Sequence, residues 1–228
     1  MDNLQSEFDA AWAAFQQLDS LRLLPDTLES EWMRGRDTYL ALLVPVTDPH
    51  VIAHLREPVR GIEKIPGVEP YPEEYWHITI KGIGFEAKTQ AQPDDFAQAE
   101  IAGLSAAARE IFAAQPTFDV AIGPLSVFPE VVFAEVRNSL AVRDLNRRLL
   151  ASMPGLVRYP YDGDAFLPHL SVARFTSNKG LPELKEAIGR LRKSPRGPTL
   201  RVAEVQLVRA HLSERAPTLE PIETYVLA

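Results

Sequence analysis

The chain has 228 residues, of which 46% are apolar and 24% charged, and its 31 acidic and 24 basic side chains give a net charge of −7. This composition is ordinary for a globular protein and excludes collagen-like, coiled-coil and fully disordered classes. No apolar run approaches the roughly 18 residues of a membrane-spanning helix, and the N-terminus lacks the features of a secretory signal, so we expect a cytoplasmic protein with no membrane partner. Because there is no Cys, disulfides and thiolate chemistry are excluded.

Acidic and basic residues are distributed unevenly along the chain. Residues 1–114 carry 9 basic and 19 acidic side chains, whereas residues 115–228 carry 15 basic and 12 acidic ones. Nonspecific binding to long RNA or DNA depends on many Lys and Arg contacts to phosphates. The acidic half therefore argues against a long nucleic acid as partner, while a small anion in a local pocket is still allowed.

The first predicted element is an amphipathic helix over residues 6–24, which begins at Ser6 as N-cap and is stopped by Pro25. Its apolar face consists of Phe8, Trp12, Phe15 and Leu18. Burial of a large apolar side chain stabilises a fold by roughly 1.5–3 kcal/mol. We therefore expect this helix to dock on the rest of the protein.

Helices and strands alternate irregularly along the remaining chain. The apolar spacing predicts further helices over residues 27–33, 49–63, 94–114, 138–153 and 181–193. It predicts strands over residues 39–46, 76–85, 117–122, 131–136, 167–175, 200–211 and 222–227. Two halves show a similar order of elements. The short connection over residues 123–130 joins two strands directly, which favours an α+β fold with antiparallel sheets over a doubly wound parallel sheet.

Two of the five histidines share a local pattern. His77 and His169 each begin a run of His, apolar, hydroxyl and apolar residues, and both runs lie in predicted strands. With typical residue usage, two such matches among five histidines arise by chance well under about 1% of the time. The pair is therefore a strong functional signal, whereas either histidine alone is more simply a structural residue.

Strand geometry explains the spacing within each motif. Side chains alternate across a strand, so His77 and Thr79 face the same way at roughly 6–7 Å, as do His169 and Ser171. If the two strands lie against one another across a cleft, a phosphodiester fits between the imidazoles, and both hydroxyls donate to its oxygens. The pattern thus predicts an acid, a base and an oxyanion clamp.

These motifs resemble those of the 2H phosphoesterase superfamily, specifically its 2′,5′ RNA ligase and cyclic phosphodiesterase branch, which is known for two His-x-Ser/Thr-x motifs. The first motif extends to HITIKGIG at residues 77–84 and the second to PHLSVAR at residues 168–174, and both are similar to the long family forms. Residues 123–136 resemble the hairpin before the second half. The resemblance covers about residues 37–228 and departs from the family at Gly82, where a bulky apolar residue is usual.

The resemblance implies a bilobal α+β fold with pseudo-twofold symmetry, in which two antiparallel sheets and flanking helices surround a central groove. The two-lobed domain would span residues 37–228, which leaves residues 1–36 as an N-terminal helical extension. The resemblance also implies chemistry on RNA-derived phosphodiesters without a metal or another cofactor.

Four further residues are candidates for substrate binding. Lys81 has the strand parity of His77 and can neutralise phosphate, although a solvated strand-end Lys fits its position equally well. Arg174 matches the family motif, but its parity points it away from the groove unless a β-bulge re-aims it. Phe128 and Tyr161 lie in loops that could flank the groove and stack on a base, while packing in the core or a turn is the simpler interpretation.

A metal site is the next rival interpretation of the two histidines. Zinc sites need three or four protein ligands, and neither motif has a third His or a carboxylate at ligand spacing. Asp162 and Asp164 precede His169, but they fit a turn better than a metal site. We therefore expect no metal.

The leading hypothesis is metal-independent hydrolysis of a nucleotide 2′,3′-cyclic phosphate, or a related cyclic ribose phosphate, to the 2′-phosphomonoester that the resemblance implies. His169 is assigned as base and His77 as acid, with the reverse assignment left open. The rivals are a 2′,5′ phosphodiester RNA ligase or 2′,5′-oligonucleotide phosphodiesterase, and a non-catalytic nucleotide- or RNA-binding module. We expect a monomer that acts on a small nucleotide or an RNA-end phosphodiester.

Overall fold

The computed structural model describes residues 4–193, 197–212 and 217–228. Its helices are α1 Leu4–Gln16, α2 Leu24–Leu28, α3 Pro49–Glu63, α4 Gln98–Ala113, α5 Leu140–Ser152 and α6 Leu181–Leu191, with short 3₁₀ turns η1 Glu73–Tyr75 and η2 Gly163–Ala165. Its strands are β1 Thr38–Pro45, β2 Val68–Pro70, β3 His77–Glu86, β4 Asp95–Phe96, β5 Phe118–Phe128, β6 Val131–Arg137, β7 His169–Phe175, β8 Thr199–Val202, β9 Glu204–His211 and β10 Thr218–Val226. None of these helices is long and apolar enough to cross a bilayer.

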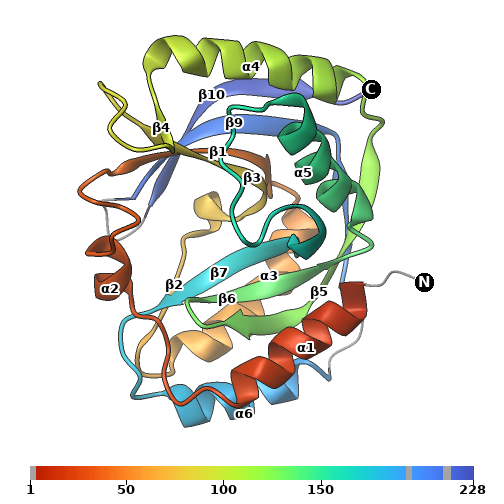
Figure 1. Ribbon diagram of the computed structural model, residues 1–228. Coiled ribbons are helices and arrows are strands. Elements are labelled where there is room, and N and C mark those ends of the chain that lie inside the picture. The colour runs from red at the N-terminus through yellow and green to blue at the C-terminus, as the bar shows by residue number, and fades with distance from the viewer. Residues whose placement is uncertain (1–3, 194–196, 213–216) are drawn as a thin grey trace.

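The described strands form one curled sheet with two halves. The first half-sheet is β10-β9-β1-β3 and the second is β7-β6-β5-β8, with every neighbouring pair antiparallel. Short strands extend it, since β2 pairs with β7, and β4 pairs in parallel with β3. The half-sheets join where β3 meets β7, through the single residue pair Ile78 and Leu170. The predicted α+β fold of two antiparallel halves is confirmed, and Figure 1 shows one half-sheet above the other.

The C-terminal strands link opposite ends of this sheet. The sequence predicts one strand over residues 200–211, but the structure breaks it at Ala203, between β8 and β9. β8 forms the outer edge of the second half-sheet, and β9 lies inside the first. Because one residue separates strands from the two ends of the path, the sheet curls strongly. The prediction of a single strand is wrong. Residues that favour strands continue through Ala203, where the chain passes from pairing with β5 to pairing with β1 and β10.

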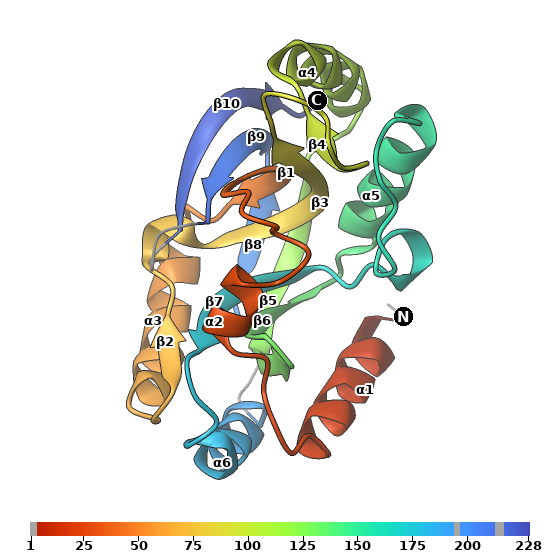
Figure 2. The same ribbon diagram turned by 60° about the vertical axis from the view of Figure 1, so that its left-hand side comes forward.

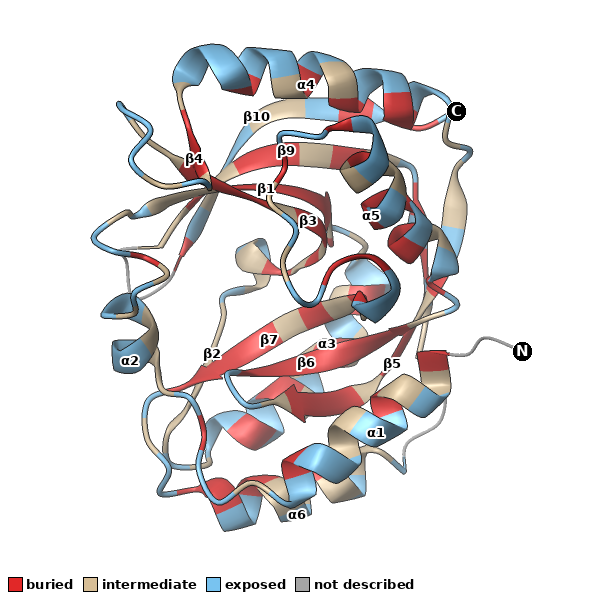
Figure 3. Ribbon diagram, viewed as in Figure 1, coloured by how far each residue is buried: buried red, intermediate tan, exposed pale blue. Residues whose placement is uncertain are grey.

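Helices cover the outside of the curled sheet. α4 lies along the first half-sheet and α6 along the second, while α3 and α5 stand on opposite sides of the molecule (Figures 1 and 2). Apolar residues of α3, α4, α5 and α6 all enter the main core cluster with residues of both half-sheets. Figure 3 shows most of the inner strands buried and the outer helix faces exposed, while the edge strand β10 is mostly exposed or half-buried. This main cluster ties the two halves together.

Most predicted elements occur near their expected positions. Helix α3 matches its predicted range of 49–63, where the Asp48 side chain accepts hydrogen bonds from the backbone N–H groups of His50 and Val51. The helix expected over residues 27–33 is instead α2, which starts and ends earlier, and residues 29–35 form turns. The longest predicted helix starts late because Asp95 and Phe96 form β4.

The N-terminal helix docks as predicted, but it is shorter. α1 ends at Gln16 rather than at residue 24, and Ser6 lies inside it rather than at its N-cap. Phe8 and Phe15 are buried, while Trp12 is half-buried. The ring of Phe8 lies 6.2 Å from that of Phe133 on β6. The first helix of the extension is therefore packed on the second half-sheet.

Candidate active site

The two histidine motifs lie side by side where the half-sheets join. Ile78 on β3 pairs with Leu170 on β7, and both are fully buried in the main core. Because side chains alternate across strands, the flanking residues of both motifs lie on the opposite face. The register set by this pair puts His77 opposite Ser171 and Thr79 opposite His169. The two histidines thus occupy one diagonal of a compact four-residue set.

The two imidazoles are held in the same way. The Nδ1 atom of His77 lies 2.6 Å from the carbonyl oxygen of Tyr75, and the Nδ1 atom of His169 lies 2.9 Å from that of Leu167. In each case the acceptor stands two residues earlier, just after or within a short 3₁₀ turn. An Nδ1–H group that donates to a carbonyl leaves Nε2 as the reactive nitrogen. Both histidines therefore have Nε2 available for proton transfer.

Aromatic side chains fix the planes of the two rings. Tyr75 packs edge-on against His77 at 4.9 Å between ring centroids, and Phe128 packs edge-on against His169 at 5.1 Å. Phe133 supports the second contact from 5.4 Å. The predicted base-binding residue Phe128 thus lies beside His169, where it also stacks on Phe133 at 4.2 Å. The contacts of Phe128 in the structure orient the imidazole of His169.

Burial changes the proton affinity of both histidines. Removal from water lowers the pKa of His77 to about 4, and the nearby charge of His169 adds to this lowering, whereas the hydrogen bond to Tyr75 opposes it. Burial also lowers the pKa of His169, against a raising effect of its hydrogen bond to Leu167. The free protein therefore holds both rings neutral at pH 7. A bound anion would favour the protonated forms.

A β-bulge removes Lys81 from the predicted phosphate site. Leu43 pairs with Thr79 but the preceding Leu42 pairs with Lys81, so β3 carries an extra residue, Ile80. This residue reverses the parity on which the prediction rested. The Lys81 side chain is fully buried, and its Nζ atom lies 2.6 Å from Asp162 and 2.9 Å from the carbonyl of Val157. The proposed contact between Lys81 and phosphate is therefore wrong.

The Lys81–Asp162 pair belongs to a buried network behind the site. Asn146 on α5 donates to the carbonyl of Ile80 and to Asp162, at 2.9 and 3.0 Å. The second Asp162 oxygen accepts from Lys81 and from the backbone N–H of Tyr159 at 2.8 Å. The network thus ties the bulge of β3 to α5 and to the loop before η2.

A matching bulge re-aims Arg174. Val132 pairs with Ala173 but the next residue, Phe133, pairs with Ser171, so β7 carries Val172 as an extra residue. Arg174 therefore turns to the face of Ser171, which is the exception that the sequence analysis allowed for a β-bulge. Its guanidinium lies 5.5 Å from the ring of Tyr71 and 3.4 Å from Glu69. Its buried Nε atom has no hydrogen-bond partner among the described residues.

The remaining loop candidate, Tyr161, lies in the outer layer of an aromatic stack. Its ring is 54% exposed and parallel to that of Tyr159, with 5.4 Å between the centroids. The Tyr159 hydroxyl in turn lies 3.3 Å from that of Tyr39. Tyr161 thus stands one ring removed from Tyr39, and it does not line the pocket at the histidines.

A pocket of about 220 Å³ adjoins the two motifs. It is lined by His77, Thr79 and Ser171 from the motifs, and otherwise by Trp32, Tyr39, Ala41, Leu43, Tyr71, Tyr75, Ala210, Leu212 and Leu219. Sequence reasoning missed all of the aromatic residues in this wall. The run of Tyr71, Tyr75 and Trp76 directly before His77 was the one available signal. Over residues 4–193, 197–212 and 217–228, no cluster of three or more His, Asp or Glu side chains is arranged to hold a metal ion.

Comparisons with known proteins identify the family and the fold. The sequence model described as 2'-5' RNA ligase superfamily matches residues 44–214. An RNA 2',3'-cyclic phosphodiesterase of Methanothermobacter thermautotrophicus is 28% identical over 165 residues, which cover 70% of this chain and 81% of that protein. The crystal structure of Escherichia coli LigT with 3'-AMP aligns with a TM-score of 0.59 at 16% identity, covering 84% of this chain and 99% of LigT. The Agrobacterium tumefaciens protein Atu0111 aligns with a TM-score of 0.61 at 12% identity, covering 94% and 97%.

Proposed function

The chain belongs to the 2'-5' RNA ligase superfamily and is an enzyme, and on this premise we propose that it hydrolyses a nucleotide 2′,3′-cyclic phosphate to the 2′-phosphomonoester. The observation that carries the proposal is that His77 and His169 flank the Ile78–Leu170 pair at the joint of the half-sheets, each with Nδ1 bound to a carbonyl and Nε2 available. The name of the archaeal relative supports the choice of substrate.

In the proposed reaction, one neutral imidazole takes a proton from water as the water oxygen bonds to phosphorus. The bond from phosphorus to the ribose 3′ oxygen breaks, and the second imidazole, which starts protonated, gives its proton to that oxygen. Thr79 and Ser171 donate hydrogen bonds to the phosphoryl oxygens, where negative charge grows in the transition state. Neither hydroxyl acts as a nucleophile.

The two histidines share one proton in the reactive state. Each charged ring disfavours protonation of the other, so protonation of one keeps its partner neutral. The protonated ring acts as acid and the neutral ring as base. A substrate that needs no acid would assign the two roles.

The charges around the site suit a small substrate. Four cationic side chains around the site are engaged by carboxylates, in the pairs Lys81–Asp162, Arg174–Glu69, Arg137–Glu135 and Arg36–Asp94. Binding of an extended RNA backbone depends on Lys and Arg that can contact successive phosphates. The proposed substrate is therefore a mononucleotide or the terminal nucleotide of an RNA rather than a long strand.

A substrate panel tests the proposal. We expect the protein to hydrolyse 2′,3′-cyclic mononucleotides in the presence of EDTA, with the 2′-phosphate as product by ³¹P NMR, because the chemistry uses no metal. Cyclic ADP-ribose phosphate and a 2′,5′-linked dinucleotide complete the panel. Loss of activity in EDTA with recovery on added Zn²⁺ would support the metal-site rival, and cleavage of the 2′,5′ linkage alone would support the oligonucleotide phosphodiesterase.

The pH dependence gives a second measurement. We expect kcat/KM for a cyclic mononucleotide to follow a bell centred on the acid side of 6.5, because burial lowers both histidine pKa values from that ordinary value, to about 4 for His77. Between the two lowered values one ring is protonated and the other neutral, as the reaction requires. The bell for kcat should lie at higher pH, because bound phosphate favours the imidazolium. A kcat/KM that keeps rising above pH 7 would contradict this assignment.

A further inference from the structure

We propose that Trp32 is the platform on which the nucleobase of the substrate stacks, so that the segment before the family match takes part in recognition. The inference rests on the proposed function in assuming a nucleotide substrate. Trp32 lines the same pocket as His77, Thr79 and Ser171. It stands outside residues 44–214, the range that the family model matches.

The pocket divides by chemistry into two parts. Its motif end presents an imidazole and two hydroxyls, which suit a phosphate. The other lining residues are aromatic or aliphatic, and none of them carries a formal charge. Among them, Tyr39 contacts Trp32 directly. A neutral planar ring attached to a phosphate-bearing ribose matches both parts, because every nucleobase has a face that can stack on an aromatic side chain.

The indole of Trp32 is held by its neighbours. The rings of Tyr39 and Phe85 pack against it at centroid distances of 5.1 and 4.8 Å, with interplanar angles of 59° and 61°. Tilted contacts of this kind restrict the ring without stacking on it. Trp32 remains half-buried rather than enclosed, so it can meet a ligand at the pocket surface.

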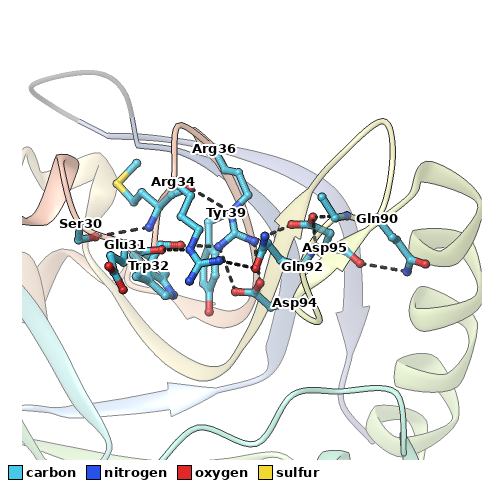
Figure 4. A network of polar contacts seen from close by, with 12 residues as sticks. Ser30, Glu31, Trp32, Arg34, Arg36, Tyr39, Gln90, Gln92, Asp94 and Asp95 are labelled. Carbon is cyan, nitrogen blue, oxygen red and sulfur yellow. Dashed lines mark hydrogen bonds and ion pairs between the residues drawn. The ribbon is translucent and has the colours of Figure 1, made fainter.

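Arg36 fastens the backbone that carries Trp32. Its guanidinium donates to the carbonyls of Trp32 and Met33, and it forms ion pairs of 2.6 Å with Asp94 and Asp95 (Figure 4). These two carboxylates lie at and just before β4, beside the end of β3. The contacts place residues 32–36 against the first half-sheet. A stacking platform needs such a fixed position, since a mobile ring loses conformational freedom on binding.

Gly82 provides the space that this wall requires. A Cβ atom at residue 82 would lie 2.5 Å from the Tyr39 hydroxyl and 3.2 Å from its ring. The Tyr39 ring therefore crosses directly over β3 at the position where the family usually has a bulky residue. Gly82 thus leaves room for the Tyr39 ring over the strand. From there Tyr39 supports Trp32 of the extension from one side.

Two substrates distinguish stacking from a structural role. The first is adenosine 2′,3′-cyclic phosphate, and the second is methyl riboside 2′,3′-cyclic phosphate, which has no base. For Trp32→Ala we expect KM to rise roughly 5- to 150-fold on the adenosine substrate, with little change in kcat, and to be nearly unchanged on the baseless substrate. Trp32→Phe should recover most of the loss. Trp12→Ala is the matched control, since it removes an indole from α1 of the same extension, outside the pocket.

Other outcomes would overturn the inference. Equal losses on both substrates, or a similar loss in Trp12→Ala, would show that Trp32 only supports the fold. If the wild-type protein hydrolyses neither substrate, the proposed function fails. Binding of adenosine 2′-phosphate, measured by calorimetry, then tests stacking on Trp32 separately. Weaker binding in Trp32→Ala but not in Trp32→Phe would support stacking, whereas no binding, or equal binding by all variants, would refute it.

Discussion

Alanine at His77 or at His169 is expected to lower the turnover of a 2′,3′-cyclic nucleotide by roughly 10²- to 10⁴-fold. The register at Ile78 and Leu170 places the two imidazoles on one face, where they can serve one phosphate. Base and acid then act in the same step, so removal of either one stops concerted proton transfer. The double variant should therefore lose far less than the product of the two single losses.

Steady-state kinetics on the single and double variants measure this coupling, with circular dichroism to show that each variant is folded. Thr79→Ala and Ser171→Ala are the matched comparisons, since each keeps both histidines and removes one oxyanion donor. Loss of one such donor typically costs about 10²-fold in turnover. Full activity in either histidine variant, or multiplicative losses in the double variant, would contradict the two-histidine mechanism.

A substrate with a good leaving group separates the acid from the base. A p-nitrophenyl phosphodiester releases a stable phenolate that needs little protonation, so the acid becomes dispensable. The variant that lacks the acid should therefore lose much less activity on this substrate than on the cyclic nucleotide, while the variant that lacks the base should lose activity by similar factors on both. A small loss in His77→Ala would support His77 as acid, a small loss in His169→Ala would support the reverse, and equal losses in both variants would contradict a division into acid and base.

Asp162→Ala is expected to lower the free energy of unfolding by about 3–5 kcal/mol, because it leaves the buried ammonium of Lys81 without its partner. The same change removes the acceptor for the backbone N–H of Tyr159 and one partner of Asn146. Removing both charges with Lys81→Met and Asp162→Ala together should cost less than Asp162→Ala alone, since no unpaired charge then stays buried.

Urea unfolding followed by circular dichroism gives these free energies, provided that the dependence on denaturant is unchanged between variants. Asp164→Ala is the matched control, because Asp164 lies two residues away with a side chain that is 91% exposed in its ion pair with Arg147. Such a surface pair contributes about 0–1 kcal/mol. If Asp162→Ala is no more harmful than Asp164→Ala, the buried network does not stabilise the fold as described.

Local patterns predicted the parts of the site that depend on one strand at a time. Alternation within each motif correctly separated Ile78 and Leu170, which enter the core, from the histidines and hydroxyls beside them. Helix α3 was predictable to the residue because Asp48 and Pro49 mark its start. These features need no knowledge of distant partners.

The errors arise where strand pairing decides the structure. Assigning side chains to alternate faces of a strand assumes that the strand has no β-bulge. The bulges at Ile80 and Val172 are defined by pairing with the neighbouring strands, so the sequence of one strand does not show them. They turned Lys81 away from the groove and Arg174 toward its face. In the same way, the break at Ala203 reflects a change of partner between half-sheets. Trp32 escaped notice because its link to the motifs is entirely tertiary.

The anchoring of both histidines through Nδ1 has a consequence for successive turnovers. After one proposed reaction, the proton has left the acid and another has arrived on the base, so the pair is charged in the wrong order for the next substrate. Because each Nδ1–H is held by a carbonyl, of Tyr75 or Leu167, neither ring can pass its proton out through that side. The reset must therefore run through the two Nε2 atoms, which exchange protons with water in the emptied groove. Proton return is thereby linked to product departure. The acid regains its proton for the next cycle only after solvent has entered the groove.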